Sequence, residues 1–144
     1  MPMIPASWFL RRAAGLLILA ILLAGGGAQA ATPEPTEGRY LTDILKDPVY
    51  RRAWSRMIGN PGPRERWLRA DRLSGPGGPS REVWIAGRSY ERADTCKRHD
   101  CGDNRFDVLF APGGTRAVGV LRQPGRARIF GSPTAAERRT LLGV

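Results

Sequence analysis

The chain has 144 residues, 25% of them charged, and its 23 Lys and Arg against 13 Asp and Glu give a formal net charge of +10. This length fits one domain that can bury most of its unfolded surface without a metal ion or several disulfides. The basic residues, almost all arginine, are scattered singly or in pairs rather than gathered in one tract, which argues against nucleic acid as a partner.

The first thirty residues have the organisation of a secretory signal peptide. Arg11 and Arg12 precede an apolar run over residues 13–24, and small residues stand at the two positions that a signal peptidase reads, Ala28 and Ala30. Such a run is too short to span a bilayer, which takes about 18 apolar residues or more. We therefore predict removal of residues 1–30, export to the periplasm and no membrane association afterwards. An uncleaved membrane anchor is the alternative.

The next segment, residues 31–39, contains two prolines and no large apolar side chain, which predicts a flexible leader. We expect a single domain over residues 40–144. After loss of the signal peptide the chain keeps 21 basic and 13 acidic residues, a net charge of +8. The mature protein is therefore basic, but not extremely so.

A short helical turn followed by a longer helix is predicted at the start of the domain. Asp47 and Pro48 suit the N-cap and the first helical position, and Gly59 or Asn60 suits the end. Apolar residues recur between them at helical spacing, so this helix should lay one apolar stripe on a flat surface. The stripe comprises Val49, Tyr50, Ala53, Trp54, Met57 and Ile58.

Short strands follow a helical turn near Trp67 and a loop rich in Gly and Pro. Residues 81–93 alternate as a hairpin, residues 104–122 form a second hairpin turned at Pro-Gly-Gly, and residues 126–130 add a strand. A last helix starts after Ser132, or after Thr134 with a capping box. These elements predict an α+β fold, an antiparallel β-sheet meander of four to five strands flanked by N-terminal and C-terminal helices.

The two cysteines, Cys96 and Cys101, enclose the one histidine of the chain in the sequence Cys-Lys-Arg-His-Asp-Cys. A disulfide between them is the default in an oxidising compartment. Two thiols and one imidazole within six residues cannot converge on a tetrahedral metal ion, so no metal or other cofactor is predicted. A thioredoxin-like redox pair needs two intervening residues rather than four. One histidine without a nucleophile and an orienting acid gives no hydrolytic triad, so we predict that the protein is not an enzyme.

The small ring closed by this disulfide adds only about 2 kcal/mol of stability. Its effect on shape is greater, because it holds the enclosed residues in a protruding loop with little freedom left to lose on binding. That is the design of an inhibitory loop, and its residues are Lys97, Arg98, His99 and Asp100. A plain surface loop with an exposed histidine is the alternative that the residues alone leave open.

The loop and the residues that follow it, Asp-Asn-Arg-Phe-Asp-Val-Leu-Phe-Ala-Pro, resemble the signature region of the inhibitor of vertebrate lysozyme family, Ivy. The usual loop of that family reads Cys-Lys-Pro-His-Asp-Cys and runs into an Asn-Arg-Phe strand. The likeness covers most of residues 40–142, from the first helix region through the strand pair and the Pro-Gly-Gly turn to the terminal helix. The match is fairly specific, because five of the six loop positions and the next strand agree in order and context.

This resemblance implies a periplasmic protein that plugs the active-site cleft of c-type lysozyme with its disulfide-closed loop. His99 occupies the position of the inhibitory histidine of the family. Lys97 and Asp100 would contact the walls of the cleft, and Cys96 and Cys101 would hold the geometry. None of these implied roles is catalytic.

Two departures from the family pattern bear on the target. Arg98 stands where the family commonly has proline, which exchanges a stiffened backbone for a long cationic donor. Vertebrate c-type lysozymes are themselves basic, so a partner with a net charge of +8 is repelled at long range. The alternative partners are the cell's own lytic transglycosylases, restrained by the same loop, or an envelope component bound without any inhibitory role. The sequence also leaves a homodimer open.

Overall fold

The computed structural model describes residues 38–144. The predicted signal peptide, residues 1–30, and all but the end of the predicted leader, residues 31–39, lie outside the described residues. Arg39, the last residue of that leader, already contacts the domain. Its carbonyl accepts a hydrogen bond from Ser80 N–H at 2.9 Å, and its guanidinium lies 2.7 Å from the carboxylate of Glu91.

The helices of the described range begin and end where the local signals predict. Asp47 caps the second helix, since its carboxylate accepts from Val49 N–H at 2.7 Å, and Gly59 ends this helix with a φ of 62°. The last helix uses the second predicted start, with a capping box between Thr134 and Glu137. No helix within residues 38–144 has the length and apolar content required to cross a bilayer. The helical elements are α1 (Leu41–Ile44), α2 (Pro48–Ile58), η1 (Arg66–Leu68), η2 (Pro112–Gly114) and α3 (Ala135–Leu142).

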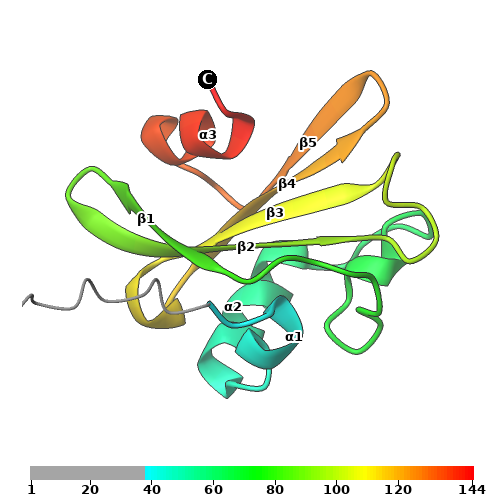
Figure 1. Cartoon of the computed structure of the whole chain (residues 1–144), viewed down its shortest axis with the longest axis horizontal. Helices are drawn as coiled ribbons and strands as arrows, with labels where there is room; N and C mark the ends of the chain where they lie inside the picture. Colours follow the sequence, from blue (N-terminus) through cyan, green and yellow to red (C-terminus); the bar gives the residue numbers. More distant parts are fainter. Residues whose placement is uncertain (1–37) are drawn as a thin grey trace, which may run out of the picture. The chain divides into compact units, whose positions relative to one another are not determined.

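The described strands form one antiparallel sheet in chain order, which confirms the predicted α+β meander with five strands (Figure 1). They are β1 (Arg81–Ile85), β2 (Arg88–Cys96), β3 (Arg105–Phe110), β4 (Ala117–Gln123) and β5 (Arg126–Phe130). The sequence placed the cysteine loop between two hairpins. In the structure β2 also pairs with β3, up to the pair Cys96 and Arg105, so the loop is itself the turn of the central hairpin.

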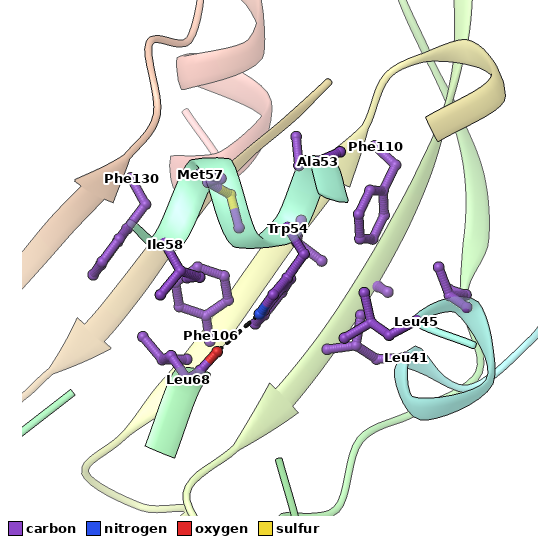
Figure 2. Packing of buried hydrophobic residues seen from close by; sticks show 14 of the residues in the cluster. Leu41, Leu45, Ala53, Trp54, Met57, Ile58, Leu68, Phe106, Phe110 and Phe130 are labelled. Carbon is purple, nitrogen blue, oxygen red and sulfur yellow. Dashed lines mark hydrogen bonds between the residues drawn. The ribbon is translucent and has the colours of Figure 1, made fainter. Parts of the chain in front are cut away.

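One face of the sheet packs against α1, α2 and η1 (Figure 2). Trp54 is fully buried there, meets the Phe106 ring edge-on at 5.3 Å between centroids, and donates from Nε1 to the carbonyl of Leu68 at 2.8 Å. The prediction that Val49 belongs to the apolar stripe is wrong, because 37% of it is exposed. Val49 precedes Tyr50 by one residue, about 100° around the helix, and so falls at the margin of the stripe.

The opposite face packs against α3, and a buried carboxylate fastens it. Glu137 is completely buried and accepts from Tyr90 Oη and from Thr134 N–H, both at 2.7 Å, and from the Arg116 guanidinium. Burial raises the pKa of Glu137, but the hydrogen bonds from Thr134, Tyr90 and Arg116 outweigh it, so the net pKa lies below the ordinary value. The ionised carboxylate therefore ties α3 to β2 and to the turn that precedes β4.

The β1–β2 turn has two residues, Ala86 and Gly87, between the paired residues Ile85 and Arg88. Their φ angles are 49° and 74°. Positive φ at both central positions is the requirement of a type I′ hairpin turn. Next to this turn, 69% of Trp84 is exposed, on the face of β1 opposite Val83 and Ile85 as the alternation predicts.

Candidate functional site

The cysteine loop forms the turn of the central hairpin, between β2 and β3 (Figure 1). Cys96 is the last residue of β2, and the predicted disulfide to Cys101 is present, with the two Cα atoms 4.9 Å apart. Lys97 N–H donates to the Asn104 carbonyl at 2.9 Å, which extends the contact between the two chain segments beyond the sheet. All six residues from 96 to 101 are thus brought into one closed turn.

The backbone holds His99 in a conformation that few residues other than glycine adopt. Asp100 N–H donates to the Lys97 carbonyl at 2.9 Å, and His99, at the third position of this four-residue turn, has a φ of 62°. Within residues 38–144, Ala86 is the only other non-glycine residue with positive φ, so φ at Arg98 is negative. This sign pattern is that of a type II turn, which favours proline at the position that Arg98 occupies. The proline usual in the family thus has a structural reason.

The carboxylate of Asp100 accepts hydrogen bonds from two side chains, one inside the loop and one just after it. Lys97 Nζ lies 2.8 Å from Asp100 Oδ2, and Asn104 Nδ2 donates to the same oxygen at 2.9 Å. The hydrogen bond from Lys97 lowers the pKa of Asp100, and the positive charge of Lys97 and the bond from Asn104 act in the same direction. Lys97 and Asp100 therefore face each other across the turn, and Asp100 does not orient the imidazole.

His99 and Arg98 remain exposed at the tip of the loop. Neither side chain makes a hydrogen bond or an ion pair with any residue from 38 to 144. Neither residue lines any of five surface hollows that lie elsewhere in residues 38–144. The loop is therefore a projection that can enter a cavity of another molecule.

Sequence reasoning missed two residues that support the loop, Asn104 and Gln123. Asn104 is 9% exposed, and its Oδ1 accepts from Gln123 Nε2 at 2.6 Å. Gln123 Oε1 in turn accepts from Arg126 Nε at 2.7 Å. A polar relay therefore runs from Asp100 to the turn between β4 and β5. The sequence contains only a weak indication of this support, because the bond between Asn104 and Gln123 depends on the β3–β4 register and joins residues 19 positions apart.

A second support comes from the Gly- and Pro-rich segment before β1, which the sequence indicates only as a loop. Cys96 N–H donates to the Pro76 carbonyl at 3.0 Å, so the segment lies against the end of β2. A Cβ at Gly75 would lie 1.6 Å from the Cys96 carbonyl oxygen, and one at Gly77 would lie 2.2 Å from the Asp94 carbonyl oxygen. Glycine is required at both positions by this close approach.

The donor set of the loop suits recognition of acceptors on another molecule. Its exposed tip offers an imidazole and a guanidinium, and its cysteines are bonded to each other. In the part of the chain that the structure describes, no three His, Cys, Asp or Glu side chains gather as metal ligands. The site is thus defined by a rigid, projecting histidine.

The antiparallel sheet with helices on both faces and the disulfide-closed loop are the features that the resemblance to a family of lysozyme inhibitors implies. The family model described as "Inhibitor of vertebrate lysozyme (Ivy)" matches residues 49–141, and the chain belongs to that family. The chain is also 28% identical over 139 residues to "Inhibitor of vertebrate lysozyme" from Pseudomonas aeruginosa, and the match covers 87% of this chain and 90% of that protein. The resemblance seen in the sequence is thereby confirmed.

Proposed function

We propose that this protein inhibits a c-type lysozyme by placing the Cys96–Cys101 loop in the active-site cleft of the enzyme. The observation that carries this proposal is the state of His99, which is exposed, has a φ of 62° and lies in a loop closed by a disulfide. A side chain whose backbone is fixed before binding loses little conformational freedom in the complex. Membership of a family of lysozyme inhibitors supplies the class of target.

The chemistry of lysozyme explains why an imidazole suits this position. The enzyme uses two carboxyl groups, one protonated as the general acid and one ionised, on either side of the glycosidic bond. An imidazole has two nitrogen atoms and can form hydrogen bonds to both groups, and its cation donates both bonds with charge assistance. It presents no glycosidic bond, so the enzyme is occupied without any reaction. The inhibitor itself performs no catalysis.

The remaining loop residues have supporting roles in this proposal. Lys97 and Asp100 retain 42% and 33% of their side-chain exposure within their ion pair, and these exposed atoms meet the walls of the cleft. Arg98 reaches an acidic group of the enzyme. Cys96 and Cys101 hold the loop closed throughout.

The proposal includes export to the periplasm, removal of residues 1–30 and a mature protein free of the membrane. An inhibitor of this kind has to stand between the incoming enzyme and the peptidoglycan of the producing cell, and an oxidising compartment suits the disulfide. Mass spectrometry of the protein from the envelope fraction tests the prediction, with Ala31 expected as the first residue. Sedimentation of the same preparation reports whether it forms a homodimer.

A lysozyme turbidity assay tests the function. Wild-type protein should inhibit at micromolar excess or below, and His99→Ala should weaken inhibition by at least about 2 kcal/mol, roughly 30-fold. Asp103→Ala, an exposed neighbour outside the disulfide ring, serves as the control and should change inhibition less than about threefold. Absence of inhibition by the wild-type protein would rule out the proposal.

The same loop suits a second target, the cell's own lytic transglycosylases, which also cleave peptidoglycan with a catalytic acid in a cleft. The observation that favours this alternative is the net charge of +8 after removal of residues 1–30, since it repels a basic lysozyme. A pull-down from the envelope fraction with wild-type and His99→Ala protein separates the possibilities. Capture that does not depend on His99 would instead support a basic envelope-binding protein without an inhibitory role.

A further inference from the structure

Three exposed arginines, Arg98, Arg105 and Arg126, lie at the same end of the sheet as the cysteine loop. None of them forms an ion pair with an acid in residues 38–144. Asp103 is the exposed, unpaired acid of the loop region. Of these four exposed, unpaired residues, three are positively charged and one is negatively charged.

The remaining acids near the loop are already engaged. Asp100 is paired with Lys97, and Asp107 lies between Arg92 and Arg122 at 3.1 and 3.3 Å. A fourth acid, Asp94, is half-buried, and its carboxylate is 3.4 Å from Gly78 N. Among the residues that the structure describes, none of the three arginines is thus paired with a carboxylate.

The strands and the polar relay place these arginines around the loop. Arg98 is in the loop, and Arg105 is directly opposite Cys96 in the β2–β3 register. Arg126 Nε donates to Gln123, which donates to Asn104, which donates to Asp100. The start of β5 is therefore connected to the loop by side-chain contacts, and the two lie at one end of the sheet in Figure 1.

For Arg105, this arrangement does not stabilise the sheet. Arg105 is directly opposite Arg122 in the β3–β4 register, and like charges in such pairs destabilise a sheet. Arg122 is compensated by Asp107 and by the carbonyl of Leu141 at the end of α3, whereas Arg105 has no such partner in the described chain. An acidic partner would remove this repulsion on binding. Arginine also matches a carboxylate with two parallel hydrogen bonds.

We propose that the enzyme bound by the loop carries acidic side chains around its cleft, and that Arg98, Arg105 and Arg126 bind this acidic rim. This inference rests on the proposed function and narrows its target to a c-type lysozyme of acidic surface charge. A basic surface approaching an acidic one accelerates association, and this acceleration weakens as salt is added. A strongly basic lysozyme is repelled by the same three side chains.

The test measures association rate constants for the protein produced from the full sequence and purified after export. The loop-end variant carries Arg98→Gln, Arg105→Gln and Arg126→Gln. The matched variant carries Arg52→Gln, Arg88→Gln and Arg138→Gln, three exposed arginines without ion pairs in the described range. Arg88 lies at the opposite end of the sheet, and the other two lie on α2 and α3. Both variants therefore lose the same charge.

Two c-type lysozymes, one acidic and one basic, are each measured from about 20 to about 300 mM salt, which spans strong to weak screening. At low salt the wild-type protein should bind the acidic enzyme at least about tenfold faster than the basic one. The loop-end variant should lose about tenfold in rate on the acidic enzyme, and the matched variant less than about threefold.

The outcomes separate the two proposals. If the wild-type protein inhibits neither lysozyme, the proposed function fails. If it inhibits, but the two variants lose equally or the basic enzyme binds as fast as the acidic one, the function stands and the acidic-rim inference is overturned.

Discussion

Two turns at opposite ends of the sheet hold the non-glycine residues with positive φ in residues 38–144, and they are supported very differently. At the β1–β2 turn, the positive φ of Ala86 is a requirement of the two-residue hairpin itself. Gly87, the next residue, faces open space, since no atom lies within 4 Å of a Cβ added there. The strain of this turn serves the chain reversal alone.

At the β2–β3 turn, His99 is surrounded by restraints. A disulfide closes the turn, Asp100 is tied to Lys97 and Asn104, and the segment at Gly75 lies against Cys96. Backbone strain of this kind costs about 1–3 kcal/mol and persists where the surroundings over-determine it. The difference between the turns supports the proposal for His99, because several independent restraints hold its positive φ, whereas the turn geometry alone accounts for that of Ala86.

The largest difference between the two turns should appear when a methyl group is added at glycine. The methyl group of Gly75→Ala would overlap the Cys96 carbonyl and force the two backbone segments apart. This substitution should lower the free energy of unfolding by about 3 kcal/mol. Gly87→Ala meets no atom but has a φ of 74°, and should cost only about 1 kcal/mol. Urea unfolding measures both changes. Equal, small losses of unfolding free energy in the two variants would show that the segment at Gly75 can move away from Cys96 at little cost.

Glycine at the two strained positions should separate strain from function. His99→Gly and Ala86→Gly both relieve positive φ, so each should change the free energy of unfolding by no more than about 1 kcal/mol. His99→Gly should nevertheless lose at least about 30-fold in inhibition, while Ala86→Gly retains it. Thermal unfolding and the turbidity assay on both proteins check this. A potent His99→Gly protein would contradict the role of the imidazole.

Removal of the support side chain tests whether the loop is held in place through Asn104. Asn104→Ala deletes the bonds to Asp100 and Gln123 and should weaken inhibition three- to tenfold, about 1 kcal/mol. Ser89→Ala, which deletes the bond to Glu82 beside the other turn, is the control and should leave inhibition unchanged. Hydrogen exchange of the loop amides should rise in the first variant only. No rise would mean that the disulfide alone holds the loop.

Proline should be accepted in one turn and rejected in the other. Arg98 has the negative φ that proline requires, and its N–H donates to no residue in the described range, so Arg98→Pro should raise the free energy of unfolding by about 0.5 kcal/mol. Against a basic lysozyme it should also bind more tightly, because it removes a repelled charge. Ala86→Pro should destabilise, since φ there is 49°. A loss of stability in Arg98→Pro would exclude the type II turn.

The smallest effect should be the response of the loop to acid. The pKa of Asp100 is lowered in the folded protein, chiefly by Lys97, so its contribution is present above the unfolded value of about 3.9 and lost as pH falls through the lowered value. The carboxyl signal of Asp100 in an NMR titration should therefore move below about pH 3.9 in the wild type. Lys97→Met should return its midpoint toward that value. An unchanged midpoint in Lys97→Met would show that the ion pair with Lys97 does not lower the pKa of Asp100.

Local signals predicted the elements that local chemistry decides. Asp47 and Pro48 marked the start of α2, the alternation around Gly87 marked the first hairpin, and the spacing of the two cysteines indicated a closed loop. The pairing of β2 with β3 followed less directly, and it makes the loop the turn of the central hairpin. The export signal over residues 1–30 stays a prediction.

Contacts between distant residues could not be predicted in the same way. The bond between Gln123 and Asn104 follows from strand register, which the sequence of either strand alone does not determine. The approach of Gly75 to Cys96 depends on the path of an irregular segment. The positive φ of His99 follows from the restraints around it rather than from any preference strong enough to read in one residue.

The segment at Gly75 and Pro76 has one more consequence, for the rim of the sheet. Strand β1 pairs with β2 only from Arg88 to Arg92, so the last part of β2 would otherwise present unpaired backbone groups at the rim of the sheet. Pro76 accepts from Cys96 N–H and occupies that rim, and proline has no N–H to donate to an incoming strand. The loop is thus presented beside a part of β2 whose backbone is covered by this segment and is not open to pairing with another strand.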